Sequence, residues 1–209
     1  GGGTPAEVVS ARGLEVVSDD GALIAAVDAA AADDCVSVIV LAGTEKAFSA
    51  GADLKEAKAN RNMNADAARR HGEASGRLYE IGDRTNKPII AAVEGYALAG
   101  GLELMIACDL VVANKDSKFG IPEAKRGLVA AGGGLLRLPD QIPHKVAMEL
   151  ALTGDFIDAA RAYDLGLINR VTDGSTMDAA MELAGAIAAN GPLAVKVSKQ
   201  VIEESRGEA

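Results

Sequence analysis

Three short apolar segments rich in β-branched residues stand out in the first half of the chain. They cover residues 36–43, 88–93 and 110–113, and the first ends at a glycine. A short run of this kind, bounded by glycine or proline, is typical of a strand that is buried on both faces. The pattern therefore predicts three buried strands.

The segments between these strands have the composition of helices. An alanine-rich stretch covers residues 22–32, and a charged stretch runs from about residue 54 to 81. Parallel strands need crossover connections, and these are usually helical. The alternation therefore predicts an α/β fold with a largely parallel sheet.

Helical patterns dominate after Pro122. Segments 144–152 and 159–165 are each followed by a glycine, a short strand is expected at 167–171, and two more helices begin near Met177 and Pro192. We therefore expect a core that carries the active site at residues 1–140 and a helical C-terminal region at residues 141–209.

Composition and charge restrict the classes of function. Apolar residues make up 49% of the 209, which is enough for one substantial core. The formal charge of −9 disfavours a general affinity for nucleic acid or anionic membranes, and every apolar run is shorter than a membrane span. Cys35 and Cys108 lie far apart within or beside apolar runs, so we expect buried, reduced thiols. With no signal-peptide pattern at the start, the sequence predicts a cytoplasmic protein.

A glycine-rich segment at residues 95–101 follows the second predicted strand and opens an apolar helix. Its glycines leave backbone N–H groups at a helix N-terminus, where the helix dipole favours negative charge. The segment lacks the Lys-Ser/Thr pair of a P-loop, and the Gly-x-Gly-x-x-Gly fingerprint of dinucleotide-binding folds is missing from the strand-to-helix junctions. We therefore expect an anion or oxyanion site here.

Two glutamates are candidate acid/base groups. Glu103 lies in the first turn of this helix among apolar neighbours, so its carboxylate needs hydrogen bonds or a raised pKa. The alternative is a first-turn glutamate that only complements the helix dipole. Glu123 follows a proline at another predicted helix start, and alone it would be an ordinary N-terminal acidic residue. The intervening chain suffices for a helix, a strand and a return turn, so both carboxylates could face one cavity.

A second glycine-containing turn, F-S-A-G-A-D-L, lies at residues 48–54 after the first predicted strand. The Ala52 N–H could point into the same cavity as the Gly100 N–H, which would give the paired donors of an oxyanion hole. The alternative is that Gly51 only shapes the turn and Asp53 caps the next helix.

Taken together, these segments resemble the enoyl-CoA hydratase/isomerase, or crotonase, family. The matching blocks are F-S-A-G-A-D-L at 48–54, K-P-I-I-A-A-V-E-G-Y-A-L-A-G-G-L-E-L at 87–104, A-C-D-L-V-V-A at 107–113, F-G-I-P-E at 119–123, A-M-E-L-A-L-T-G at 147–154 and G-L-I-N-R-V at 166–171. They follow the family order from about residue 20 to 204. The resemblance implies a crotonase-like spiral of ββα units with a helical C-terminal region, assembled as a homotrimer or a dimer of trimers.

The resemblance also implies a reaction, the reversible syn addition of water to a 2-enoyl-CoA thioester. The thioester carbonyl would lie between the N–H groups of Ala52 and Gly100. Glu103 would activate the water that attacks C3, and Glu123 would exchange the proton at C2.

The same resemblance places the coenzyme A portion of the substrate against Phe48, Ser49, Ala50 and Lys55. No cofactor is expected, because coenzyme A is part of the substrate. No metal is expected either, since His71 and His144 have no ligand partners at metal-binding spacing.

Departures from the family keep other functions open. Residues 7–18 run towards the first helix without the family's Asn-Arg-Pro motif, the C-terminal region is shorter than in the family, and Ala130-Ala131 replace a common Pro-Gly. Double-bond isomerisation or thioester hydrolysis on the same fold, and a non-catalytic CoA-binding scaffold, are the alternatives.

Overall fold

The computed structural model describes residues 6–10, 13–17, 20–44, 46–51 and 78–205. Most of the helix predicted for residues 54–81 therefore lies outside the described residues. At its end, Ile81–Arg84 forms the 3-10 helix η2.

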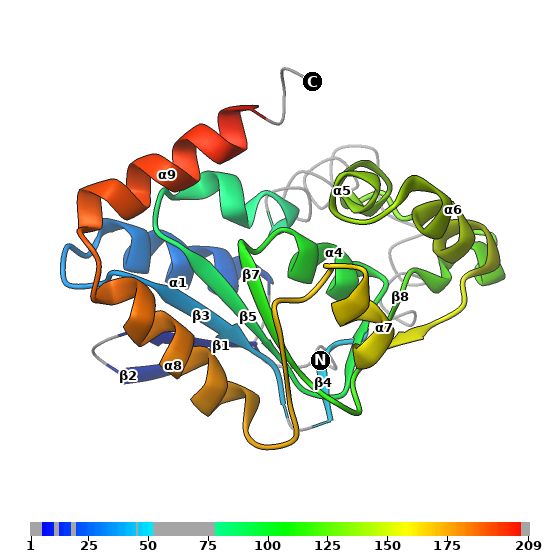
Figure 1. Ribbon diagram of the computed structural model, residues 1–209, viewed down its shortest axis with the longest axis horizontal. Helices are drawn as coiled ribbons and strands as arrows, with labels where there is room; N and C mark the ends of the chain where they lie inside the picture. Colours follow the sequence, from blue (N-terminus) through cyan, green and yellow to red (C-terminus); the bar gives the residue numbers. More distant parts are fainter. Residues whose placement is uncertain (1–5, 11–12, 18–19, 45, 52–77, 206–209) are drawn as a thin grey trace.

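The described residues form two sheets (Figure 1). The larger sheet has the strand order β10-β7-β5-β3-β1-β2, in which β3, β5, β7 and β10 run parallel and β1 is antiparallel to both of its neighbours, β3 and β2. Its strands are β1 (Ala6–Ser10), β2 (Gly13–Val17), β3 (Ile39–Ala42), β5 (Ile89–Val93), β7 (Leu110–Asn114) and β10 (Arg170–Thr172). The smaller sheet contains β4 (Ala47–Ser49), β6 (Tyr96–Leu98), β8 (Lys118–Gly120) and the antiparallel β9 (Ile157–Asp158).

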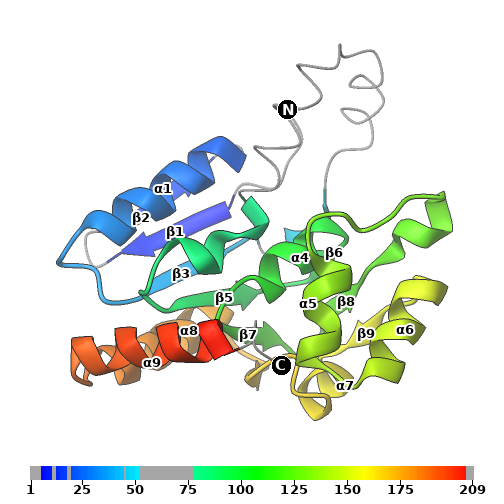
Figure 2. The same cartoon turned by 90° about the horizontal axis from the view of Figure 1, so that it is seen from above.

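The central strands β3, β5 and β7 are buried on both faces, as the apolar pattern predicted. Successive residues of a strand point to opposite faces. Val40, Ile90 and Val112 pack on helix α8 (Thr176–Ala188), whereas their neighbours Leu41 and Ala91 belong to the cluster that includes helix α1 (Asp20–Ala32). Figure 2 shows α1 and α8 on opposite sides of this sheet.

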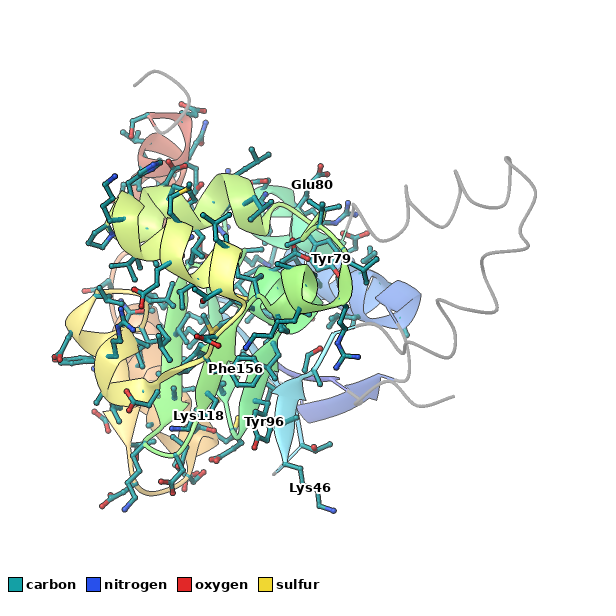
Figure 3. All side chains as sticks on the ribbon, turned by 90° about the vertical axis from the view of Figure 1, so that its right-hand side faces the viewer. Lys46, Tyr79, Glu80, Tyr96, Lys118 and Phe156 are labelled. Atoms are coloured by element: carbon teal, nitrogen blue, oxygen red, sulfur yellow. The ribbon has the colours of Figure 1, made fainter. Side chains whose placement is uncertain are left out.

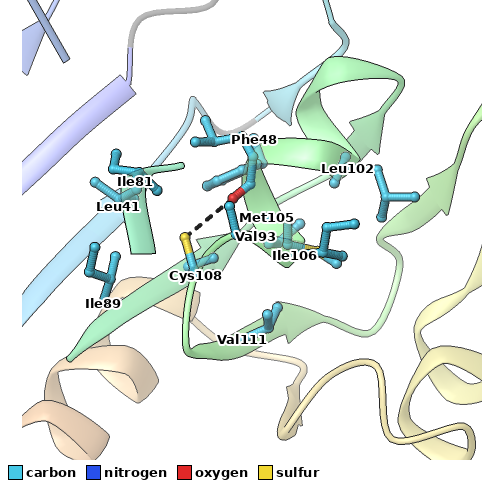
Figure 4. Close-up of a cluster of buried hydrophobic side chains, with 14 of the residues drawn as sticks. Leu41, Phe48, Ile81, Ile89, Val93, Leu102, Met105, Ile106, Cys108 and Val111 are labelled. Atoms are coloured by element: carbon cyan, nitrogen blue, oxygen red, sulfur yellow. Dashed lines mark hydrogen bonds between the residues drawn. The ribbon is translucent and has the colours of Figure 1, made fainter. Parts of the chain in front are cut away.

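The main core lies between the larger sheet and helix α4 (Gly100–Ile106) (Figure 4). Cys108 lies in this core and its thiol donates to the Leu104 carbonyl. Cys108 is buried, as predicted, and this burial raises the pKa of its thiol. The same expectation for Cys35 is wrong, because Cys35 lies in an exposed turn whose backbone N–H binds the Asp33 carboxylate.

The chain repeats one unit: a strand of the larger sheet, a strand of the smaller sheet, then a helix. β5, β6 and α4 form one such unit, and β7, β8 and the 3-10 helix η3 (Pro122–Arg126) form the next. β3 and β4 begin an earlier one. This is the predicted spiral of ββα units. Because β4, β6 and β8 are parallel, the segments that follow them start at one edge of the smaller sheet.

The chain is mainly helical beyond the third unit, as predicted. The helices are α5 (Gly134–Gln141), α6 (His144–Thr153), α7 (Ala159–Asp164), α8 and α9 (Pro192–Ser205). α5 to α7 lie on the side of α4 and η3, and α8 and α9 lie towards the other end of the molecule (Figure 1). α5 crosses the predicted boundary at residue 140, and the division into two regions stays a prediction.

A mostly buried ion pair ties α9 to the larger sheet. The Lys199 ammonium donates to Asp109 Oδ2 at 2.8 Å and to the Lys87 carbonyl at 3.1 Å. The same Asp109 oxygen accepts the Ile89 N–H at 2.7 Å. Burial raises the pKa of Asp109, and the Lys199 charge opposes that rise.

The early strands β1 and β2 are present in a segment whose sequence lacks the Asn-Arg-Pro motif. One expectation about strands needs correction. The strand predicted at 167–171 begins only at Arg170, because Leu167 and Ile168 are buried in the core before the chain pairs with β7.

Within the described ranges, no helix combines the length and the apolar character that a bilayer crossing requires. The cytoplasmic location stays a prediction.

Candidate active site

The turn from β6 into α4 is held in a strained conformation. Ala99 precedes the helix with φ 52° and ψ −128°, a region that residues with a Cβ rarely adopt. Its N–H donates to the Gly120 carbonyl at 2.9 Å, and its carbonyl accepts the Glu103 N–H at 3.1 Å. Gly100 is the first residue of α4, so its N–H has no acceptor inside the helix.

The loop after β4 lies directly against this turn. Gly51 has a φ of +86°, and a Cβ built on it would lie 2.8 Å from the Ala99 Cβ and 3.2 Å from the Gly100 nitrogen. Only glycine fits this close approach. The loop thus brings its backbone beside Gly100. The next residue, Ala52, lies outside the described residues, as does Lys55.

Glu103 is 3% exposed and its carboxylate is bound by the backbone. Oε1 accepts the Gly134 N–H at 2.9 Å. Burial raises the pKa of Glu103, while the N–H groups of Gly134 and Gly132 and the charge of Arg137 oppose that rise. Both effects expected for a buried carboxylate are therefore present.

Gly132 permits this backbone to approach Glu103. A Cβ on Gly132 would clash with the Tyr79 ring and lie 2.7 Å from Glu103 Oε2. The glycine run at residues 132–134 is the sequence signal for these donors, and it was not linked to Glu103 from the sequence alone.

Glu123 lies in η3, immediately after the proline that starts it. Its Oε2 is buried and has no hydrogen-bond partner among the described residues. Burial raises the pKa of Glu123, its own backbone N–H opposes that rise, and the nearby charge of Glu103 raises it further. The repulsion indicates that the two carboxylates lie within range of each other's charge.

The residues expected to contact coenzyme A have different surroundings. The Phe48 side chain is buried in the core, so only its backbone is left for a ligand. The Ser49 hydroxyl accepts the Gly51 N–H at 3.3 Å, and Ala50 is exposed.

Two residues near the site were missed in the sequence. Tyr79 is half-buried beside Glu80 (Figure 3), and a Cβ on Gly100 would lie 2.5 Å from its hydroxyl. Arg137 lies in the first turn of α5. Neither stands in a motif, because each meets the site only through tertiary packing.

Acidic, histidine and cysteine side chains do not gather in groups of three or more in the part of the chain that the structure describes. The predicted absence of metals and cofactors is not tested by this observation and stays a prediction.

Comparisons with known proteins agree with this arrangement. The family model for enoyl-CoA hydratase/isomerase matches residues 19–207. Enoyl-CoA hydratase EchA19 of Mycobacterium tuberculosis is 43% identical over 83% of this chain and 65% of its own length. The 2,3-dehydroadipyl-CoA hydratase of Escherichia coli is 36% identical over 88% of this chain and 71% of its own length.

Among solved structures, enoyl-CoA hydratase EchA1 of Mycobacterium marinum is 51% identical with a TM-score of 0.77, covering 89% of this chain and 71% of that one. The chain thus spans about two thirds of the length of the relatives that it matches. Similarity of this extent in both sequence and fold shows that the chain belongs to the enoyl-CoA hydratase/isomerase family.

Proposed function

We propose that the chain is a hydro-lyase that adds water reversibly and in syn fashion to a 2-enoyl-CoA thioester, giving a 3-hydroxyacyl-CoA. The observation that carries the proposal is that Glu103 and Glu123 lie within range of each other's charge but have different partners. Glu103 has two backbone donors and a nearby guanidinium, whereas Glu123 has a buried oxygen without a described partner.

These surroundings favour different protonation states. Donors directed at a carboxylate stabilise its ionised form, whereas a buried oxygen without donors favours the protonated form. A pair of carboxyl groups with contrasting environments is the usual basis of acid/base chemistry at neutral pH. Glu103 would thus be the base and Glu123 the acid.

In the proposed reaction, the Glu103 carboxylate takes a proton from water as the water oxygen bonds to C3. The C2=C3 electron pair moves towards the thioester carbonyl, and C2 then takes the proton of Glu123. Transfer of a proton from Glu103 to Glu123 restores the starting state. The Gly100 N–H, with that of Ala52, would stabilise the enolate oxygen.

The names of the relatives support an acyl-CoA substrate, since EchA19 and the Escherichia coli protein are both named as hydratases of CoA compounds. Ser49, Ala50 and Lys55, with the Phe48 backbone, are the proposed contacts for the coenzyme A portion. Isomerisation, thioester hydrolysis and binding without turnover are the other outcomes that an assay must separate.

The test follows the loss of 2-enoyl-CoA absorbance and identifies the product. Glu103→Gln and Glu123→Gln are each expected to lower kcat by about 100-fold or more, with little change in ligand affinity. Glu149→Gln, on the exposed face of α6, is the matched control and should keep wild-type turnover. Undiminished activity in either site variant would remove that residue from the mechanism, and release of free CoA would indicate hydrolysis instead.

We also propose that the chain assembles as a homotrimer or a dimer of trimers. Its α5 and α6 helices expose large apolar side chains, with Leu136 at 79% and Leu152 at 70% exposure. Exposed apolar surface of this kind favours association. Light scattering after gel filtration should give a multiple of three chains. A monomer at micromolar concentration would contradict the proposal.

A further inference from the structure

Arg137 joins two segments that meet beside Glu103. Its side chain is 22% exposed, and its Nη2 donates to Asp83 Oδ2 at 3.1 Å. Asp83 belongs to η2, the segment that follows Tyr79. Arg137 itself lies in the first turn of α5, where its backbone N–H donates to the Gly133 carbonyl at 2.9 Å.

The guanidinium folds back over the loop that binds Glu103. A Cβ on Gly133 would lie 2.5 Å from Arg137 Nη1, and Gly133 itself has a φ of +99°. Gly133 stands between Gly132 and Gly134, whose N–H groups both act on Glu103. The Arg137 side chain is therefore in position to fix this loop against η2.

The ionisable groups that face Glu103 come from separate elements. Arg137 approaches from α5, Glu123 from η3, and the Tyr79 phenol lies near Gly132 from the segment before η2. Asp83 faces Arg137 and is 55% exposed. Among the described residues, Arg137 is the cation whose charge acts on Glu103.

We propose that Arg137 is a positioning residue for the proposed hydration: anchored on Asp83, it fixes the loop that binds Glu103, and its positive charge favours the ionised form of that carboxylate. The inference rests on the proposed function and extends it to a residue that touches neither water nor thioester. It also assigns Asp83 the opposite electrostatic effect, because its negative charge partly offsets that of the guanidinium.

The first experiment needs no turnover. The carboxyl carbon of Glu103 is followed by 13C NMR through a pH titration of 13C-glutamate-labelled protein in the Glu123→Gln background, and its signal is assigned by its loss in Glu103→Gln. Arg137→Gln should move the Glu103 midpoint to higher pH, and Arg137→Lys should largely restore it. Asp83→Asn removes the negative charge but keeps a side-chain amide oxygen that can accept the Arg137 N–H, so it should move the midpoint to lower pH.

The second experiment measures kcat/KM as a function of pH for the wild type and for the Arg137 variants, with Glu123 retained. On the acidic limb of the profile, kcat/KM of Arg137→Gln should be about tenfold below that of the wild type. At high pH it should approach kcat/KM of Arg137→Lys, because Glu103 is then fully ionised in both variants. Arg161→Gln, which breaks an exposed pair on α7, is the matched control and should leave the limb unchanged.

Unchanged Glu103 midpoints in both Arg137→Gln and Asp83→Asn, or shifts of the same sign, would overturn the inference. If Arg137→Gln does not fold, the downward shift in Asp83→Asn decides alone. A wild-type protein without hydratase activity would refute the proposed function, and the NMR titration would still decide the role of Arg137.

Discussion

Glu123 is a proposed acid/base residue whose ionised form destabilises the fold. Its pKa is raised in the folded chain, first by burial and then by the Glu103 charge. A group of this kind stabilises the fold fully below its unfolded pKa, about 4.3, and loses that contribution as pH rises through the folded pKa. Ionised Glu123 is therefore a cost at neutral pH.

The resulting prediction concerns Glu123→Gln. Its melting temperature should exceed that of the wild type at pH 8, and the difference should shrink as pH falls towards about 4, where both side chains are neutral. Thermal melts across this range measure the difference. A gap that is constant with pH would show that the carboxylate carries no ionisation cost.

Ala99 is the second residue with a predictable cost. Its positive φ is strained for a side chain with a Cβ, and such strain is typically about 1–3 kcal/mol. Ala99→Gly should therefore raise the free energy of unfolding by about 1 kcal/mol, after allowing for the greater freedom of glycine in the unfolded chain. Urea denaturation measures this change, with Ala186→Gly on α8 as a control that should destabilise. Destabilisation by Ala99→Gly would show that the turn is not strained.

For single residues, the sequence identified candidate site residues where their neighbours in the chain are unusual. Glu103 was identifiable because apolar residues surround it in the chain. Arg137 and Tyr79 were not identifiable, because an arginine or tyrosine in a helix has no local feature that indicates its tertiary neighbour. Ala52 and Lys55 lie outside the described residues, so the structure leaves their predicted roles as predictions.

Among the elements, the loop that opens α5 depends on its glycines. Gly132→Ala would place a methyl group against Tyr79 and Glu103 Oε2. We expect a loss of stability of about 1–3 kcal/mol and a fall in turnover of at least about tenfold, because the Glu103 carboxylate must move. Gly185→Ala, at a position with open space around the glycine, is the control. Wild-type kinetics in Gly132→Ala would show that the loop adapts without displacing Glu103.

The attachment of α9 gives a prediction for another element. Lys199→Met removes the ion-pair partner of Asp109 and leaves a mostly buried carboxylate whose one remaining hydrogen-bond donor among the described residues is the Ile89 N–H. Breaking such a pair typically costs about 3 kcal/mol. The double variant Lys199→Met/Asp109→Asn should recover part of this loss, because the unpaired charge is gone. Equal denaturation midpoints for the single and double variants would contradict this account.

The fully buried strands were predicted from the sequence, whereas the short strands of the smaller sheet were not. β3, β5 and β7 were found because strands buried on both faces are continuously apolar. β4, β6 and β8 contain three residues each, which is too short for a period to be recognised. In β1 and β2, two adjacent valines interrupt the alternation of apolar and polar residues by which a half-buried strand is recognised.

Over the whole molecule, the site depends on the helices after the third unit as much as on the spiral. α5 supplies the backbone that binds Glu103. At η3, Lys125 pairs with Asp155 and approaches the Phe156 ring, and both partners lie in the turn after α6. From the sequence, these helices were expected to form a separate C-terminal region, and no contact between them and the active site was predicted. Their role in positioning the carboxylates follows from packing that no local pattern encodes.

The contrast between the two thiols has a use for the intact molecule. A maleimide should modify the exposed Cys35 at once, whereas Cys108 is buried, its thiol is held in the protonated form, and it can react only when the core opens. Mass spectrometry at successive times after mixing then gives the modification rate of each cysteine in one sample. Equal rates would contradict the burial of Cys108. Cys35 thus serves as the reference for reagent access and Cys108 as the reporter of core opening, so the frequency of opening can be followed without introducing a cysteine.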